Sequence, residues 1–387
     1  MPRPEHARRG GSQYSGARGP GVRSTLRGVR VATRTTLTTD QVNYLNIGLM
    51  IASAAIAFRW PFETFLFAYI LLGPLHYLTE ISWLHDRHYF TRRKYDYLVL
   101  AVAALLVTIV TFVPIPDTPS GTVVALSFAA FAAALVFVLT DSVSMRVVVA
   151  MVGLVVGAQI AALPAVDRVF GLFLPTIIHV FIFTGLFILV GALRGRSFSG
   201  ILSLAVFLTV AVVFAVTHAV STGYQASEYA RSAYGTATVR GTFIPGFMTL
   251  NYLLLTGLGM HDFGVQQTTA EQFVAGINAY LYQHPIALSL MAFIAFAYLY
   301  HYLNWFSKTS VIRWNDISRM RLAMVVAVWI ASIALYAYDS TLGFRWLFFL
   351  SLGHVFLEFP LNHVTCMTIG REIGGVLRVR KVGPSAG

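Results

Sequence analysis

The chain alternates between long apolar runs and short polar connections from about residue 43 onward. Each of ten such runs is near the ~20 residues that a helix needs to cross the hydrocarbon core of a bilayer. The runs are residues 43–59, 62–84, 97–115, 121–140, 146–163, 170–193, 199–220, 283–306, 322–338 and 341–366. This pattern predicts an all-α fold, a polytopic membrane bundle of about ten transmembrane helices.

Positive charge is concentrated in some connections and at both ends of the chain. The basic connections are residues 85–94, 194–196 and 308–321, and those with little positive charge are 114–120, 164–168 and 338–341. Lys and Arg favour the cytoplasmic side of a membrane. Ten spans with both termini cytoplasmic place every strongly basic connection inside. If the apolar stretch 243–260 also spanned, 308–321 would face outside. We therefore expect residues 221–282 to form an outer segment with a re-entrant or interfacial helix.

The flanking segments differ in composition from the transmembrane domain, which we place at residues 43–370. Residues 1–42 are rich in Arg, Gly, Ser and Thr, and their only acidic residues are Glu5 and Asp40. Such a composition predicts a disordered arm. Arg-rich, acid-poor leaders are also typical of targeting peptides, so that interpretation stays open. Residues 371–387 form a basic C-terminal tail.

Composition narrows the class of protein. The chain is 57% hydrophobic and 11% charged, whereas soluble domains are about 25% charged. The net charge of +12 comes from the arm and the connections, where topology and anionic headgroups explain it better than nucleic acid does. We expect a multi-pass protein of the bacterial inner membrane, in contact with membrane lipids and without a nucleic-acid partner. The single cysteine, Cys366, excludes a Cys-ligated zinc site or iron–sulfur cluster, so a metal would need His and carboxylate ligands.

Two helices repeat one polar pattern inside apolar sequence. His76 and Glu80 are four residues apart, so they project from one face of a helix. His354 and Glu358 have the same spacing. Ionisable residues inside a membrane segment indicate a functional site by default. Two helices that each offer a His and a carboxylate can converge on one or two metal ions. A pair of buried structural ion pairs is the alternative.

On the predicted topology, most other histidines also lie toward the cytoplasmic side. The candidate metal ligands are His76, Glu80, His85, His88, His179, His301, His354, Glu358 and His363. Several of them also have structural interpretations, such as headgroup contacts for His85 and His88 or an interhelical hydrogen bond for His179. Asn304 and Lys308 continue the helical face of His301 and are candidates to bind an acidic headgroup or orient a ligand. No residue is assigned a catalytic role.

The number and type of these candidates favour some metals over others. Imidazole with carboxylate suits iron, zinc or manganese. The candidates outnumber the three or four protein ligands of a single zinc ion. This number favours two metal ions, or one ion with further histidines around its ligands, and zinc stays an alternative to iron.

One short stretch resembles a known family. Gly73-Pro74-Leu75-His76, followed by Glu80, resembles the first motif of the bacterial carotenoid-cleaving membrane oxygenases of the Brp/Blh type, where a histidine beside Gly-Pro precedes an aspartate by four residues. Here the carboxylate is a glutamate and the order around the proline differs. The resemblance implies non-haem iron and an apolar polyene or lipid substrate, and it carries over His76 and Glu80.

These features predict a metal-dependent membrane oxidoreductase or oxygenase that acts on a lipid or isoprenoid at the cytoplasmic side. An electron-donor protein is a further candidate partner. The alternatives are an intramembrane zinc hydrolase of the ceramidase-like group, a metal-ion or proton transporter, and a bis-histidine haem carrier. Fatty-acid desaturases are disfavoured, because only His85-x-x-His88 approaches their histidine boxes and no His-His dipeptide occurs. A transporter would need polar residues through both membrane halves, whereas here they collect on one side.

Overall fold

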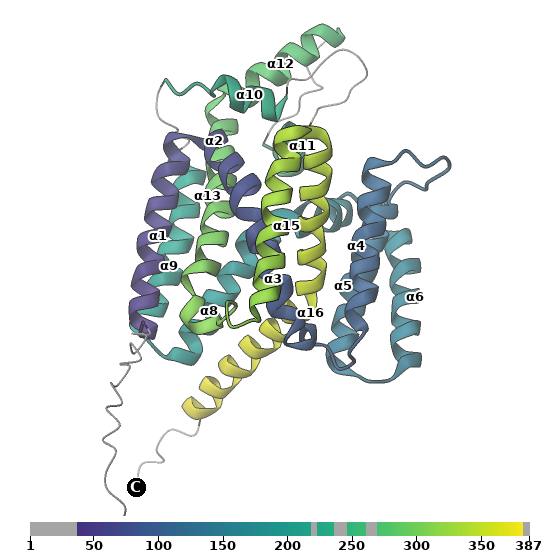
Figure 1. Cartoon of the computed structure of the whole chain (residues 1–387), viewed down its shortest axis with the longest axis vertical. Coiled ribbons are helices and arrows are strands. Elements are labelled where there is room, and N and C mark those ends of the chain that lie inside the picture. The colour runs from purple at the N-terminus through teal and green to yellow at the C-terminus, as the bar shows by residue number, and fades with distance from the viewer. Residues whose placement is uncertain (1–36, 218–222, 236–245, 261–268, 382–387) are drawn as a thin grey trace, which may run out of the picture. The chain divides into compact units, whose positions relative to one another are not determined.

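The part of the chain that this computed structural model describes, residues 37–217, 223–235, 246–260 and 269–381, is built from helices, as the apolar pattern predicts (Figure 1). The helices are α1 (Thr39–Arg59), α2 (Pro61–Leu66), η1 (Phe67–Leu72), α3 (Gly73–His85), η2 (His88–Phe90), α4 (Asp96–Phe112), α5 (Thr122–Leu139), α6 (Val143–Ile160), α7 (Pro164–Val166), η3 (Asp167–Phe183), α8 (Thr184–Gly195), α9 (Phe198–Thr217), α10 (Glu228–Tyr234), α11 (Gly246–Gly257), α12 (Ala270–Gln283), α13 (Pro285–Ser307), α14 (Thr309–Ile312), α15 (Arg319–Tyr338) and α16 (Ser340–Lys381). The all-α prediction is confirmed for these residues.

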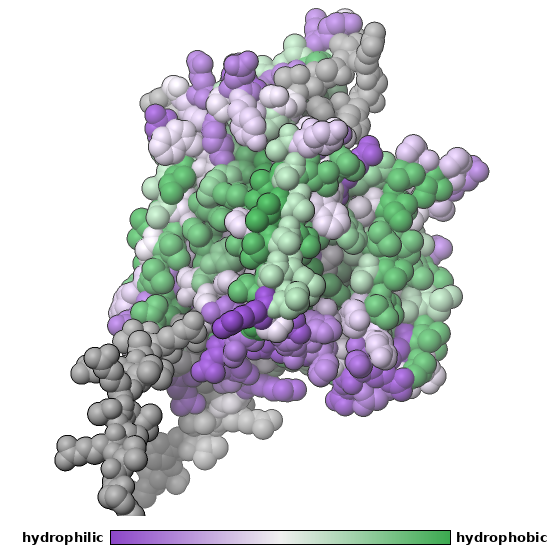
Figure 2. Space-filling view, in the orientation of Figure 1, coloured by the Kyte–Doolittle hydropathy of each residue, from purple (hydrophilic) through white to green (hydrophobic). Residues whose placement is uncertain are grey.

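Nine helical segments of the described chain are long and apolar enough to cross a membrane. The remaining predicted span, residues 97–115, corresponds to α4, a shorter apolar helix of 17 residues. Helix α6 exposes Val148, Met151 and Val155, side chains that suit contact with lipid. Figure 2 shows an apolar band across the middle of the described helices, with polar residues at both ends. These features are consistent with a multi-pass membrane protein.

The segment predicted to lie outside the membrane contains the short helices α10, α11 and α12. Helix α11 has 12 residues, so it is about 18 Å long and too short to cross a hydrocarbon core of about 30 Å. Residues 218–222, 236–245 and 261–268 of this segment lie outside the described residues.

The predicted disordered arm also lies largely outside the described residues, which begin at Leu37. Helix α1 starts within the stretch predicted as arm. The Thr38 side chain accepts a hydrogen bond from the backbone N–H of Gln41, whose side chain in turn accepts one from the backbone N–H of Thr38. Such a reciprocal capping box satisfies two donors at the start of a helix.

Close packing of α6 on α5 depends on two glycines. A Cβ atom on Gly153 would lie 3.2 Å from Cα of Ala129, and one on Gly157 would lie 3.0 Å from Cα of Ala125. The two glycines are four residues apart on α6, and the two alanines are four residues apart on α5, so each helix presents small residues along one face. Such faces let membrane helices approach closely where apolar side chains gain little by leaving lipid.

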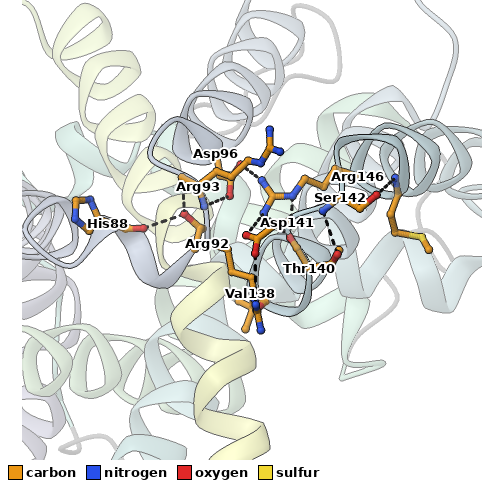
Figure 3. A network of polar contacts seen from close by, with 11 residues as sticks. His88, Arg92, Arg93, Asp96, Val138, Thr140, Asp141, Ser142 and Arg146 are labelled. Carbon is orange, nitrogen blue, oxygen red and sulfur yellow. Dashed lines mark hydrogen bonds and ion pairs between the residues drawn. The ribbon is translucent and has the colours of Figure 1, made fainter. Parts of the chain in front are cut away.

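A polar network joins the ends of α4, α5 and α6 (Figure 3). Arg146 is buried and pairs with the buried carboxylate of Asp96. Its Nε donates to the Thr140 carbonyl over 3.0 Å. The exposed Asp141 lies 3.6 Å from Arg92, and the Ser142 side chain caps α6. The basic connection at residues 85–94 is thereby held against the connection between α5 and α6.

Four helical segments carry the polar groups of the interior, and three of them contain or follow irregular or proline-containing turns. In Figure 1, α3, α13 and α16 run in the same direction, toward the end where α8 lies, and α8 continues η3. The π-helix η1 leads into Gly73-Pro74, the π-helix η3 contains Pro175, and α16 contains Pro360. Proline removes a backbone donor and π-turns are frequent at functional sites. Most of α13 is buried, which makes it the central helix of this group.

Candidate metal centre

Four histidines from four different helices meet in the interior. They are His76 on α3, His179 on η3, His301 on α13 and His354 on α16, and all four are buried. Nε2 of His301 lies 3.0 Å from Nε2 of His76. Nε2 of His354 lies 2.9 Å from Nε2 of His179. The ring centroids of His76 and His354 are 5.4 Å apart, and those of His179 and His301 are 5.0 Å apart. The two pairs therefore form one cluster.

The imidazole nitrogens converge closely enough to share an ion. A ligand nitrogen from each of His76, His301 and His354 lies within 4.8 Å of the other two. Nitrogens bound at about 2.1 Å to one ion and at right angles to each other are about 3.0 Å apart. The two short Nε2–Nε2 distances match that separation.

In two of these rings, the Nδ1 atom that points away from the cluster lies close to a polar side chain. Thr184 Oγ1 lies 2.7 Å from Nδ1 of His301. Glu358 Oε2 lies 3.1 Å from Nδ1 of His179, although their angle falls outside hydrogen-bond geometry. A partner on Nδ1 fixes the ring and directs Nε2 away from it, which is the usual arrangement for histidines that ligate a metal.

The two glutamates occupy different positions relative to the cluster. Oε2 of Glu80 lies 3.1 Å from Nε2 of His76, on the side where the rings converge. Glu358 instead contacts the outward nitrogen of His179. Glu80 is thus placed as a candidate ligand, and Glu358 as an orienting group. The equal sequence spacing of the two His-x-x-x-Glu patterns did not indicate this difference.

Two observations favour a cation among these groups. Nε2 of His76 is close to both Nε2 of His301 and the Glu80 carboxylate, and a single N–H cannot serve both. Glu80 and Glu358 are 3% and 1% exposed, and among the described residues neither forms an ion pair with Lys or Arg. Burying a carboxylate without a compensating positive charge is costly. A divalent cation held by the imidazoles would balance both.

Three predicted ligands lie apart from the cluster. His85 and His88 are exposed at the end of α3 and in the following turn; the His85 ring packs against Tyr89 and Tyr97. His363 Nε2 lies 2.9 Å from the Phe131 carbonyl oxygen. The structure therefore brings His76, Glu80, His179, His301, His354 and Glu358 together and leaves these three outside.

The predicted ligand-orienting residues flank the end of α13. Asn304 is buried, and its side-chain oxygen lies 3.4 Å from the Tyr300 hydroxyl, which donates to it. Lys308 follows the last residue of α13, where burial lowers the pKa of its ammonium to about 8. In the described part of the chain, neither residue forms a hydrogen bond or an ion pair with the four histidines.

Sequence reasoning missed three polar residues at the site. Thr184 follows His179 by five residues on the same continuous helix, and the sequence pattern does not single it out. Tyr77 and Tyr302 each follow a cluster histidine directly, and their hydroxyls are hydrogen-bonded to each other. The Tyr77 ring stacks on His354, with centroids 4.3 Å apart. Adjacency to His76 and His301 was the available signal.

Comparisons with protein-family models, curated proteins and solved structures give no match to this chain. The geometry of the histidine cluster and its surroundings is therefore the basis for inferring a function.

Proposed function

We propose that the protein is a membrane-embedded metalloenzyme, an oxidoreductase or oxygenase that acts on a lipid or isoprenoid at one non-haem iron ion. The observation that carries the proposal is the group of buried histidines His76, His301 and His354, whose ligand nitrogens lie within 4.8 Å of one another, beside His179 and two buried carboxylates. Imidazole with carboxylate is a ligand set that suits iron. Such an ion supplies oxygen and electron-transfer chemistry.

The chain's own residues divide into two roles at this site. The imidazoles of His76, His301 and His354 would hold the ion, and His179, 2.9 Å from His354, and Glu80, 3.1 Å from His76, are further candidate ligands. Glu358 and Thr184 orient two of the rings. The aromatic residues Tyr77, Tyr302 and Trp305 pack against the cluster and exclude bulk water from it.

The predicted topology indicates which side of the membrane the site is nearer to. The basic connections at residues 85–94 and 308–321 follow α3 and α13, which end nine residues after His76 and six residues after His301. Because Lys and Arg favour the cytoplasm, we place this end inside, together with both termini and the nearer face of the cluster. A reporter fused after Arg92 tests this placement, and an external location contradicts it.

Elemental analysis of the purified full-length protein, combined with optical spectroscopy, tests the metal. We expect about one iron per chain without a haem spectrum. His301→Ala and His354→Ala should each remove most of that iron. His363→Ala and His85→Ala serve as matched controls and should retain it, since these side chains lie outside the cluster.

Two outcomes would contradict the proposal. Stoichiometric zinc without iron would favour an intramembrane hydrolase, because zinc activates water without redox chemistry. A metal-free protein that His301→Ala destabilises would indicate that the histidines form two structural hydrogen-bonded pairs, because the substitution leaves a buried nitrogen of His76 without its partner.

A further inference from the structure

A cavity lies beside the histidine cluster, on the side facing α11. Its volume is about 520 Å³, and aromatic and aliphatic side chains line most of it. Its lining includes Thr176, Tyr298 and Ser351. Each of these residues precedes a cluster histidine by three positions, on η3, α13 and α16 respectively. Since residues three apart on a helix are neighbours on one face, the cavity reaches the edge of the cluster.

A second cavity continues the first toward the end of the molecule that carries α11. Its volume is about 480 Å³. The two cavities share Val123, Gly171, Leu172 and Leu253 in their linings. The two cavities are therefore adjacent, and Phe247 and Leu250 of α11 line part of the inner one.

The outer cavity contains one acidic and one basic side chain, whose charges balance. It contains Asp167 and Arg168, both exposed, together with Thr122 and Thr256. Neither the Asp167 carboxylate nor the Arg168 guanidinium pairs with another side chain in the part of the chain that the structure describes. One carboxylate beside one guanidinium offers an acceptor and donors without net charge. That combination suits a neutral hydrogen-bonding group better than an ion.

We propose that the two cavities form a binding site for a long-chain amphiphile with a neutral, hydroxyl-type head. The head lies at Asp167 and Arg168, and the apolar chain extends past Gly171 toward the histidines. The volumes lie within the range of small-molecule sites, which are mostly apolar with a few placed polar groups. As a substrate site this inference rests on the function proposed above, whereas binding itself does not require the metal.

Gly171 lines both cavities and Gly257 lines the outer one, so a larger side chain at either position would block part of the space. A Cβ atom on Gly171 would meet nothing nearer than Val124 Cγ2 at 3.4 Å, and one on Gly257 would lie 3.2 Å from Leu172 Cδ2. A methyl group is therefore tolerated at Gly171, whereas Gly171→Phe would fill the shared space. Gly257→Leu would narrow the outer cavity from α11. Gly191, on the same continuous helix as Gly171, has no atom within 4 Å of an added Cβ, so Gly191→Phe is a matched control.

Photolabelling of the full-length protein in lipid nanodiscs tests the proposal. The probes are hexadecanol, hexadecane and hexadecanoic acid, each with a mid-chain diazirine, and labelled peptides are mapped by mass spectrometry. We expect saturable labelling of cavity-lining residues of η3 and α16 by the alcohol, and weaker labelling by the alkane. Asp167→Asn should weaken the alcohol's apparent affinity by about tenfold. Gly171→Phe and Gly257→Leu should reduce labelling to background, and Gly191→Phe should leave it unchanged.

Several outcomes would overturn the inference. Labelling confined to lipid-facing surfaces, or labelling that survives both Gly171→Phe and Gly257→Leu, would show that the cavity is not the site. Stronger labelling by the acid than by the alcohol would contradict the neutral head. Iron content and thermal stability, measured on the same variants, separate a blocked cavity from an unfolded protein. They also distinguish failure of this inference from loss of the metal centre.

Discussion

The Glu358 carboxylate lies 3.1 Å from Nδ1 of His179 on η3, although its own helix carries His354 one turn earlier. The contact joins α16 to η3 on the outward side of the cluster. A carboxylate in this position orients the imidazole and raises its basicity as a ligand. The glutamate of α16 thus supports a ring that a different helix supplies.

Glu358→Gln is expected to weaken metal binding without abolishing it. The amide keeps the size of the side chain but loses the charge that acts on His179. Loss of such an orienting partner costs about 10–100-fold in metal affinity. Competition with a chelator measures the change, and His363→Gln, on the same helix, is the control. An unchanged affinity would show that the carboxylate plays no part in binding.

Thr184 is expected to position His301 through its hydroxyl. Thr184→Val keeps the shape of the side chain and removes the 2.7 Å contact with Nδ1. We expect about a tenfold loss of metal affinity and an altered optical spectrum of the bound metal. Thr184→Ser restores the hydroxyl and should recover both properties. If valine and serine behave alike, the contact does not position the ring.

Gly73→Ala is expected to destabilise the protein through the tyrosine pair. An added Cβ would lie 2.9 Å from the Tyr77 hydroxyl oxygen and 3.3 Å from that of Tyr302. Overpacking of this kind costs about 1–3 kcal/mol. Combining it with Tyr77→Phe removes the nearer oxygen and should recover part of the loss in thermal unfolding experiments. Gly48→Ala meets no neighbouring atom and should not destabilise; equal losses at both glycines would contradict the prediction.

The buried ion pair between Arg146 and Asp96 is expected to matter more than the exposed pair beside it. Removing one partner of a buried pair leaves an uncompensated charge, which costs about 3–5 kcal/mol. Asp96→Ala should therefore lower thermal stability strongly. Asp141→Ala removes an exposed carboxylate that lies 3.6 Å from Arg92 and 3.9 Å from Arg146, and about 0–1 kcal/mol is expected for such an exposed group. Similar losses for both variants would show that burial does not determine the effect.

Lys308 is expected to react with acylating reagents at an unusually low pH. Burial disfavours its ammonium form and lowers the pKa to about 8, so half of the amine is free near that pH. The chain has two other lysines, Lys94 and Lys381, and mass spectrometry distinguishes the three. The labelling rate at Lys308 should rise to half its maximum near pH 8. A half-maximum close to the ordinary value of 10.5 would contradict this.

The sequence was sufficient to predict the helices, because apolar runs of membrane length have few alternatives to a helix in lipid. It also indicated His76 and His354, since an ionisable side chain inside a membrane helix is costly and usually belongs to a functional site. Spacing along one helix did not reveal which partner each glutamate contacts, because Glu358 meets His179 across helices.

The predicted ligands that lie outside the cluster failed to join it for a related reason. His85 and His88 are near His76 in sequence, but His85 is the exposed last residue of α3 and His88 lies in the exposed connection that follows. His363 is two and a half turns beyond His354 on α16, where it meets the α5 backbone. Sequence proximity to a site and predicted membrane depth therefore do not determine which face of a helix a side chain occupies.

The four histidines are separated along the chain, and the last of them lies on α16, the final helix described. During synthesis the helices emerge in chain order, so His76, His179 and His301 must wait for His354 and Glu358. A chain interrupted before Ser340 has three of the imidazoles and lacks the carboxylate that steadies His179. Loading of the proposed ion would then follow translation of α16, and a bound ion would report that α16 had packed against the three earlier helices.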